Sequence, residues 1–345
     1  MTPPRFALLS ITPLVAFLTI HATGCGRSEN PTPLTPPTPA ATIPAELTAE
    51  MDFRDSAITA QQIEQIVANA SLRRLRLTGS DLNDTAIAKI AKLPQLELLD
   101  LVNCQSLSPA ALVSIGQIES LRNLRLSGPI VTDQSIQNLI NLKQLAAILL
   151  QQTAVTDSGI SALGQLPQLK DINLFGTPIT DESLATFKQL PKLEKLGLRG
   201  TAITGQNAAP LAELAAVKEL DVSETAFTSA GMPSVATMPK LTKLNLWLTK
   251  VDDAGVDTLR GNTRLTSLNL DNVASITDAS IDTIATLTSL QYLHLGGTTI
   301  TASGIEKLAP LKKLEILIAT RLGLTAEDAT MIRNALPSLQ RLDVD

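Results

Sequence analysis

Aromatic residues, histidine and cysteine are all scarce in this chain of 345 residues. Aromatics make up 2% of the sequence, and it has two histidines and two cysteines, whereas 44% of its residues are hydrophobic. Catalytic triads, zinc sites and general-base pairs mostly need histidine, and only His294 lies beyond the N-terminal segment described below. No CxxC, HExxH, GxSxG or GxxxxGKS motif occurs. We therefore expect no enzyme, no cofactor and no metal site.

Excess positive charge and long apolar runs are also missing. The net charge is −5, and the lysines and arginines are scattered among acidic residues. Nucleic-acid binding needs a positive stripe, so we expect no nucleic-acid partner. The longest N-terminal apolar run, 6–20, spans 15 residues, whereas a helix that crosses a membrane needs roughly 20. A protein with several membrane spans is therefore excluded.

The N-terminus has the pattern of an export signal. Arg5 precedes the apolar run 6–20, and small residues then lead to Cys25. The four residues Ala22-Thr23-Gly24-Cys25 resemble the lipobox of bacterial lipoproteins. This resemblance implies that 1–24 is removed and that lipid on Cys25 anchors the exported protein to a membrane, facing the periplasm or the cell surface. Simple cleavage that leaves a free Cys25 remains an alternative.

A linker rich in proline and threonine follows. Residues 31–44 read PTPLTPPTPAATIP, a composition that favours extended polyproline geometry and makes a semi-rigid spacer of about 40 Å. We assign 25–45 to this lipid-anchored linker and 46–345 to the folded domain.

The folded domain repeats with a period of 24 or 25 residues. The hexad LxxLxL, or a close variant, begins at Leu72, Leu96, Leu121, Leu145, Leu169, Leu193, Val217, Leu241, Leu265, Leu290, Leu314 and Leu339. A degenerate earlier copy places Met51 and Phe53 24 residues before Leu75 and Leu77. The array therefore holds about thirteen units.

Each unit combines a strand pattern with a helix pattern. Alternating leucines predict a short strand, and an apolar trio at a spacing of three, such as Ile160, Leu163 and Leu166, predicts a short helix or 3₁₀ segment. A Thr-Asp pair such as Thr156-Asp157 signals the helix start. Neither element buries its apolar side alone, so the units must stack into an α/β solenoid with one parallel sheet.

This pattern resembles the leucine-rich repeat family. The resemblance implies a horseshoe with the sheet on its concave face and helices or 3₁₀ segments on its convex side. The recurring Thr-Asp is similar to bacterial repeats of the cysteine-containing subclass, and Cys104 lies where that subclass has Asn or Cys. We expect Cys104 to be a buried, unreactive thiol that forms no disulfide with Cys25.

Aspartates recur at one position of successive units. Asp133, Asp157 and Asp181 should lie in a row about 5 Å apart. Helix capping explains them, although a row of carboxylates could also bind Ca²⁺. Since Ca²⁺ needs six or more converging oxygens and a row presents them in parallel, we expect capping.

The outward strand positions form three columns on the concave face, and they hold the candidate partner-binding residues. Aromatic rings among polar and charged groups are typical of protein-binding hot spots, and Gly197 should leave a dip between Phe175 and Trp247. The candidates are Phe175, Lys195, Arg199, Asp221, Asn245, Trp247, Asn269, Asp271, Tyr292 and His294.

These observations predict a membrane-anchored, extracytoplasmic bacterial module that binds an unidentified protein on its concave face. Charges at the end of the last strand, Asp343 and Asp345, discourage pairing with another chain, so we expect a monomer. Two alternatives remain open. Aromatic rings beside Asn and Asp also suit a glycan or cell-wall ligand, and the array could be a passive structural protein of the envelope.

Overall fold

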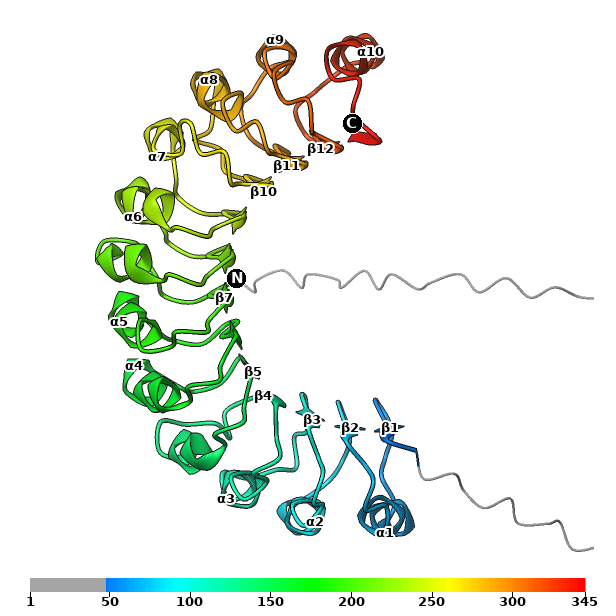
Figure 1. Cartoon of the computed structure of the whole chain (residues 1–345). Helices are drawn as coiled ribbons and strands as arrows, with labels where there is room; N and C mark the ends of the chain where they lie inside the picture. Colours follow the sequence, from blue (N-terminus) through cyan, green and yellow to red (C-terminus); the bar gives the residue numbers. More distant parts are fainter. Residues whose placement is uncertain (1–47, 345) are drawn as a thin grey trace, which may run out of the picture. The chain divides into compact units, whose positions relative to one another are not determined.

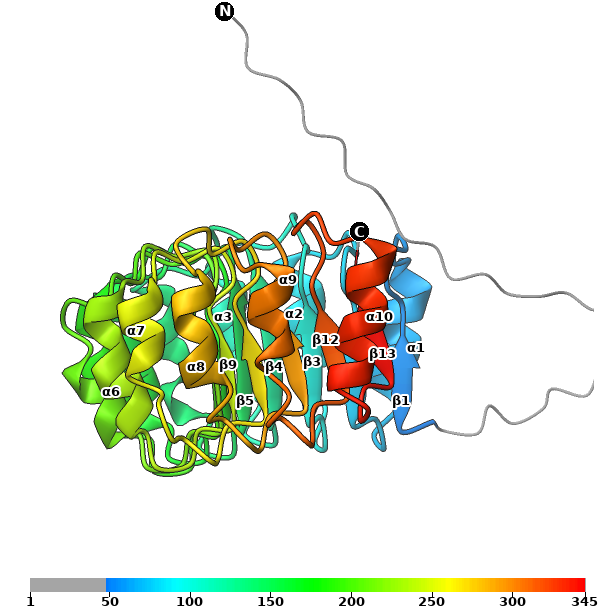
Figure 2. The ribbon, with the colours of Figure 1, turned by 90° about the horizontal axis from the view of Figure 1, so that it is seen from above.

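Thirteen parallel strands form one sheet in the part of the chain that the computed structural model describes, residues 48–344. Each strand pairs with the next along the chain, so sheet order is sequence order. The strands lie on the inner edge of an arc, and the helical segments lie side by side on its outer edge (Figures 1 and 2). The predicted α/β solenoid of about thirteen repeats is confirmed. The predicted signal 1–24 and the predicted linker 25–45 lie outside the described residues.

The elements are short, as the repeat length requires. The strands are β1 Glu50–Asp52, β2 Arg74–Arg76, β3 Leu98–Leu101, β4 Asn123–Ser127, β5 Ala147–Gln151, β6 Asp171–Asn173, β7 Lys195–Gly197, β8 Glu219–Asp221, β9 Lys243–Asn245, β10 Ser267–Asn269, β11 Tyr292–His294, β12 Ile316–Ile318 and β13 Arg341–Asp343. The α-helices are α1 Ala60–Ala68, α2 Asp84–Ile90, α3 Ala111–Ile115, α4 Asp157–Ile160, α5 Leu184–Phe187, α6 Met232–Thr237, α7 Asp253–Asp257, α8 Ile281–Ile284, α9 Ala302–Glu306 and α10 Ala326–Ala335. The 3₁₀ segments are η1 Ser135–Asn141, η2 Ser161–Gln165, η3 Asp181–Ser183, η4 Ala209–Glu213, η5 Ser229–Gly231 and η6 Asp278–Ser280.

A ladder of aliphatic side chains runs through the sheet and forms the centre of the core. Met51 pairs with Leu75 and Leu75 with Leu99, which places the degenerate first unit in the same register as the others. Leu75 and Leu99 are fully buried, and the apolar residues of the helical side pack against the ladder. Each fully buried leucine stabilises the fold by about 1.5–3 kcal/mol, so stacking holds the units together.

The turn after most strands contains a residue in the left-handed region. Glycine adopts it at Gly79 (φ 72°) and Gly176 (φ 67°), and asparagine at Asn103 (φ 60°) and Asn272 (φ 54°). Both residue types tolerate this conformation, and the residue that follows each of these four, Ser80, Thr177, Cys104 or Val273, is buried.

Aspartates and threonines tie successive repeats together on the way to the helical side. Thr156 and Thr180 each cap their helical segment with the side-chain oxygen, as predicted. The aspartate of one unit also reaches the next unit: the Asp157 carboxylate accepts from the Thr180 amide (2.9 Å) and hydroxyl (2.7 Å). Asp133 bonds Thr156 in the same way. The row of carboxylates thus caps the neighbouring repeat, a bond between units that the sequence analysis did not foresee.

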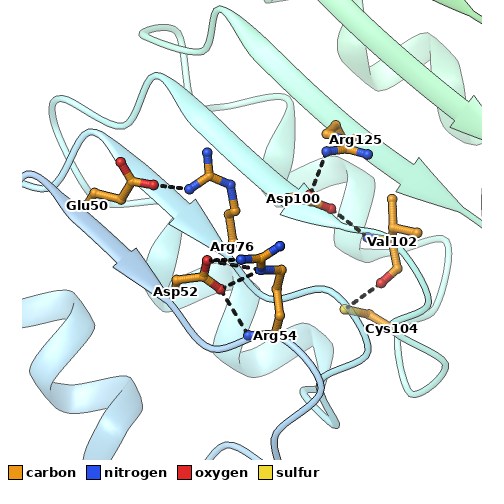
Figure 3. Close-up of polar contacts among 8 residues, drawn as sticks. All are labelled: Glu50, Asp52, Arg54, Arg76, Asp100, Val102, Cys104 and Arg125. Carbon is orange, nitrogen blue, oxygen red and sulfur yellow. Dashed lines mark hydrogen bonds and ion pairs between the residues drawn. The ribbon is translucent and has the colours of Figure 1, made fainter. Parts of the chain in front are cut away.

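Ion pairs cover the first strands on the concave side (Figure 3). Glu50 on β1 pairs with Arg76 on β2, and Asp100 on β3 pairs with Arg125 on β4 at 3.2 Å. The Asp100 side chain is only 3% exposed and also accepts from the Val102 amide at 3.2 Å. These charged groups are satisfied within the chain.

Cys104 is buried, as predicted, with 4% of its surface exposed. Its thiol lies 3.1 Å from the Leu77 carbonyl oxygen and 3.9 Å from that of Val102, the contact drawn in Figure 3. Burial raises the pKa of the Cys104 thiol to about 11. The thiol therefore stays protonated at neutral pH.

Residues 48–344 hold neither a membrane-spanning helix nor a cluster of metal-binding side chains. No helix in that range has the length and apolar character to cross a membrane. Nor do three or more histidine, cysteine or acidic side chains of this range come together in a group that could hold a metal ion.

Candidate functional site

The ten candidate residues all lie on the concave side, in the stretch from β6 to β11. Six are strand residues, namely Lys195, Asp221, Asn245, Asn269, Tyr292 and His294. Four lie two residues after a strand, namely Phe175, Arg199, Trp247 and Asp271. The structure therefore divides the candidates into two groups, one on the strands and one at the strand exits.

Arg199 lies between two aromatic rings at the strand exits. Its guanidinium carbon is 4.8 Å from the centroid of the Phe175 ring and 4.8 Å from that of the Trp247 ring. Glu224 holds the same guanidinium with two hydrogen bonds, of 2.8 and 3.0 Å. Cation–π contacts on both faces and a bidentate carboxylate fix this long side chain in one place. We call Phe175, Arg199 and Trp247 the aromatic stack.

The aromatic stack corrects one prediction. Gly197 was expected to leave a dip between Phe175 and Trp247, but Arg199 fills that space. Ser223 follows the intervening strand β8 and is small and fully buried. The Arg199 side chain can therefore extend across the repeat of Ser223 to reach Trp247. The hollow lies instead over the strands themselves, around Gly197, and has a volume of about 430 Å³. Neither Phe175 nor Trp247 lines it.

Part of the predicted outward column is buried. Val102 is 7% exposed, Ser127 9% and Ser223 0%, although the alternation of the strand places all three on the concave side. Ser127 accepts from the Asn103 amide at 2.7 Å and so lies under the turn of the preceding unit. These three small side chains are covered by neighbouring residues. The predicted outward column is therefore not open to solvent along its whole length.

Several polar candidates have a structural task in their own turn. The side-chain oxygen of Asp221, Asn245 or Asn269 accepts from the backbone N–H two residues later, at 2.9, 3.1 and 2.9 Å respectively. This bond fixes the turn that follows each strand. The amide nitrogens of Asn245 and Asn269 form no bond with any residue of 48–344, so they remain as donors on the concave face.

His294 follows the same rule with its ring nitrogen. The Gly296 amide donates to Nδ1 of His294 at 3.2 Å, so we assign the proton of the neutral ring to Nε2. Burial lowers the pKa of His294, and this effect outweighs the nearby Asp271 carboxylate, which raises it. Asp271 itself pairs with Arg321. The 3.7 Å approach between Asp271 and His294 is therefore not an ion pair at neutral pH.

The Glu219 carboxylate pairs with two lysines on the neighbouring strands, Lys195 and Lys243. Glu219 on β8 lies 3.4 Å from Lys195 on β7 and 3.0 Å from Lys243 on β9. Hydrogen bonds and charges from the lysines lower the pKa of Glu219, although burial, the largest single effect, raises it. Lys195 is thus a paired residue, and its charge is partly neutralised before any partner arrives.

Sequence reasoning missed Leu248, which follows Trp247. Leu248 occupies the left-handed turn position with φ 52°, where other units have glycine or a polar residue such as Glu224 (φ 54°), and its surface is 50% exposed. A leucine there is strained by roughly 1–2 kcal/mol. Aligning the repeats would have revealed it, because a large apolar residue stands where the backbone favours Gly. Strained backbone positions cluster at functional sites.

Two buried polar atoms beside the aromatic stack have no partner. The indole N–H of Trp247 and the hydroxyl of Ser223 form no hydrogen bond with the residues that the structure describes. An unsatisfied buried donor destabilises a protein by about 1–3 kcal/mol. The exits of β8 and β9 thus hold two buried polar groups without a hydrogen bond, next to the exposed Leu248.

Comparison with known families agrees with the repeat and the fold. The family described as "Leucine-rich repeat region" matches residues 51–283, and a second description, "Leucine Rich repeat", matches 286–309. The chain belongs to the leucine-rich repeat family. Domains of this family are in general modules that bind other proteins, and no enzyme family is indicated. Among curated protein sequences, none matches the chain.

Solved structures of bacterial leucine-rich repeat proteins share the fold. An internalin from Listeria monocytogenes is 20% identical with a TM-score of 0.62, and the match covers 86% of this chain and 82% of the internalin. A leucine-rich repeat protein of Leptospira interrogans is also 20% identical, with a TM-score of 0.55, over 81% of this chain and 74% of that protein. At this identity, the likeness concerns the fold alone.

Proposed function

We propose that this leucine-rich repeat protein is an exported bacterial lipoprotein that binds another protein on the concave side, at the exits of β6 to β9. Leu248 is the observation that carries the proposal, since a large apolar side chain is half exposed next to Trp247 at a left-handed turn position where the other units have glycine or a polar residue. The aromatic stack adds rings held rigidly by Arg199, and such anchors lose little entropy on binding.

The location of the protein is the second part of the proposal. The lipobox-like residues before Cys25 and the Pro/Thr-rich linker support display outside the cytoplasm on a lipid anchor. The internalin and the Leptospira protein are bacterial proteins with this fold. The likeness to the cysteine-containing subclass is carried by the recurring Thr-Asp pairs and by Cys104. A Cys25→Ser variant should lose both incorporation of radiolabelled fatty acid and recovery in the membrane fraction. Unchanged membrane recovery would contradict lipid anchoring.

Capture from a native envelope extract tests the binding surface. Residues 45–345 serve as bait beside a Trp247→Ala, Leu248→Gly double variant. Val113→Ser on α3 is the matched control, because Val113 is equally exposed, at 51%, but belongs to the helical side. We expect a protein that wild type and the control retain and the double variant loses. Equal recovery by all three would contradict binding at this surface.

Trp247 also makes the test direct, because it is the only tryptophan of the chain. A ligand that covers the aromatic stack should change the intrinsic fluorescence. Titration with the captured protein should give this change, while solubilised cell-wall glycan should not. A change with glycan alone would favour the glycan-binding alternative, and no change with either would favour a passive structural role.

A further inference from the structure

The hollow around Gly197 is not a requirement of the backbone. Gly197 ends strand β7 without a left-handed φ, and an added Cβ would meet nothing closer than Asn173 Cγ at 3.4 Å. By contrast, a Cβ at Gly159 or Gly231 would collide with neighbouring atoms at 2.3 and 2.4 Å. All other strands of residues 48–344 carry a side chain at the position of Gly197. A glycine that the fold does not need often marks a place where a ligand approaches closely.

The walls of the hollow hold more negative than positive charge, with three carboxylates against two lysines. The Asp171 carboxylate on β6 forms no hydrogen bond or ion pair with any residue of 48–344, and Asp221 on β8 only accepts from the backbone amide of Ser223. The cations that line the hollow, Lys195 and Lys243, are both within 3.4 Å of Glu219. Asp171 and Asp221, on the strands that flank Gly197, therefore have no hydrogen-bonded cation of their own within residues 48–344.

Burial makes this arrangement unfavourable for the chain alone. Loss of hydration raises the pKa of Asp171, and the charge of Lys195 compensates only in part. A partly buried carboxylate gains free energy when a cation pairs with it, most of all if the cation also forms hydrogen bonds. The volume of about 430 Å³ lies within the roughly 300–1,000 Å³ of small-ligand sites.

We propose that the hollow around Gly197 receives a lysine or arginine side chain of the protein partner, which pairs with Asp171 and Asp221. This inference rests on the proposed function. The acidic balance of the chain, −5, favours a basic partner surface. Beside the hollow, the free amide donors of Asn245 and Asn269 suit backbone carbonyl oxygens of the same partner segment.

Selection of random peptides on the full-length protein tests the inference. We expect enriched peptides to carry a lysine or arginine. Replacing that lysine by norleucine, or the arginine by citrulline, should weaken binding about tenfold to wild type. On an Asp171→Asn variant the same replacement should change binding less than about twofold. An Asp282→Asn variant is the control, since Asp282 is exposed on α8 and far from the sheet in its unit; it should retain the full effect.

A second variant closes the hollow. Gly197→Leu should weaken binding of the basic peptide about tenfold, without the backbone strain that a left-handed glycine would cause. If replacing the basic residue of the peptide weakens binding to Asp171→Asn as much as it weakens binding to wild type, the inference is overturned. If Trp247→Ala still weakens those peptides, the proposed function survives that result. Peptides indifferent to both Trp247→Ala and Gly197→Leu would overturn the two proposals together.

Discussion

Replacing Asp181 by alanine should destabilise the array more than any surface change. The Asp181 carboxylate is 7% exposed and accepts four hydrogen bonds, from the Thr204 amide (2.8 Å) and hydroxyl (2.7 Å) and from the amides of Gly205 and Asn207 (both 3.1 Å). Hydrogen bonds to a charged group contribute about 1.5–3 kcal/mol each, and four would sum to more than about 6 kcal/mol. Water can reach Asn207 and part of Thr204, so we expect a loss of about 3–4 kcal/mol.

An asparagine at the same position separates shape from charge. Its amide nitrogen would oppose the Asn207 amide, so Asp181→Asn should lose about 1–3 kcal/mol. Burial raises the pKa of Asp181, but the hydrogen bonds from Thr204, Asn207 and Gly205 together lower it below its ordinary value. A lowered folded pKa gives stability that is complete above about pH 3.9, the unfolded value, and is lost as the pH falls through the folded value. The difference between wild type and Asp181→Asn should therefore shrink below about pH 4.

Urea unfolding of residues 45–345, followed by circular dichroism, measures these losses. Hydrogen exchange at the Thr204 and Gly205 amides reports the same bonds locally, which matters because a repeat array can open in part. Asp282→Ala, at an exposed position of α8, is the control and should change stability by less than about 0.5 kcal/mol. If Asp181→Ala is no less stable than this control, and its amides exchange at the wild-type rate, bonds between units do not stabilise the array.

Three further predictions concern the candidate face and the core. Leu248→Gly should change the free energy of unfolding by less than about 1 kcal/mol, because relief of left-handed strain offsets the entropy of glycine, yet it should weaken partner binding; a large loss of stability in urea would refute this. Arg199→Met should alter the emission of Trp247 and release Glu224, with a loss of about 1 kcal/mol or less; an unchanged spectrum would contradict the stack. Cys104 should react with a thiol reagent at pH 8 only after unfolding, as peptide mapping will show, since burial holds its pKa near 11; rapid labelling of the native protein would contradict this.

The repeat itself was predictable because stacking imposes it on every unit. Leu75 and Leu99 must meet in the core, so their spacing defines both the strands and the register. The cap at Thr180 was equally predictable, since it depends on neighbours in sequence. The bond from Asp157 to Thr180 crosses 23 residues, and a period alone does not reveal in which direction a carboxylate points.

The candidate face was predictable in position but not in detail. Strand alternation placed Trp247 and Phe175 on the concave side, as the structure has them. The path of Arg199 depends on three-dimensional packing, because a long side chain crosses a whole repeat to the place where Ser223 is small. The dip at Gly197 was therefore predicted correctly, but its predicted place between Phe175 and Trp247 was wrong, since neither ring lines the hollow.

The repeats behind the candidate face also depart from the pattern on the helical side. Where the units of Thr156 and Thr180 have Thr-Asp, residue 205 is glycine and residue 229 is serine, so no carboxylate joins Thr204 to Thr228. The Thr228 amide and hydroxyl instead bond the Thr204 carbonyl, at 3.0 and 3.2 Å. Neutral bonds are weaker than charged ones. On the helical side, the units of β7 and β8 are thus joined at this position by neutral bonds alone, and a partner that spans β7 to β9 would add stability to the array across this joint.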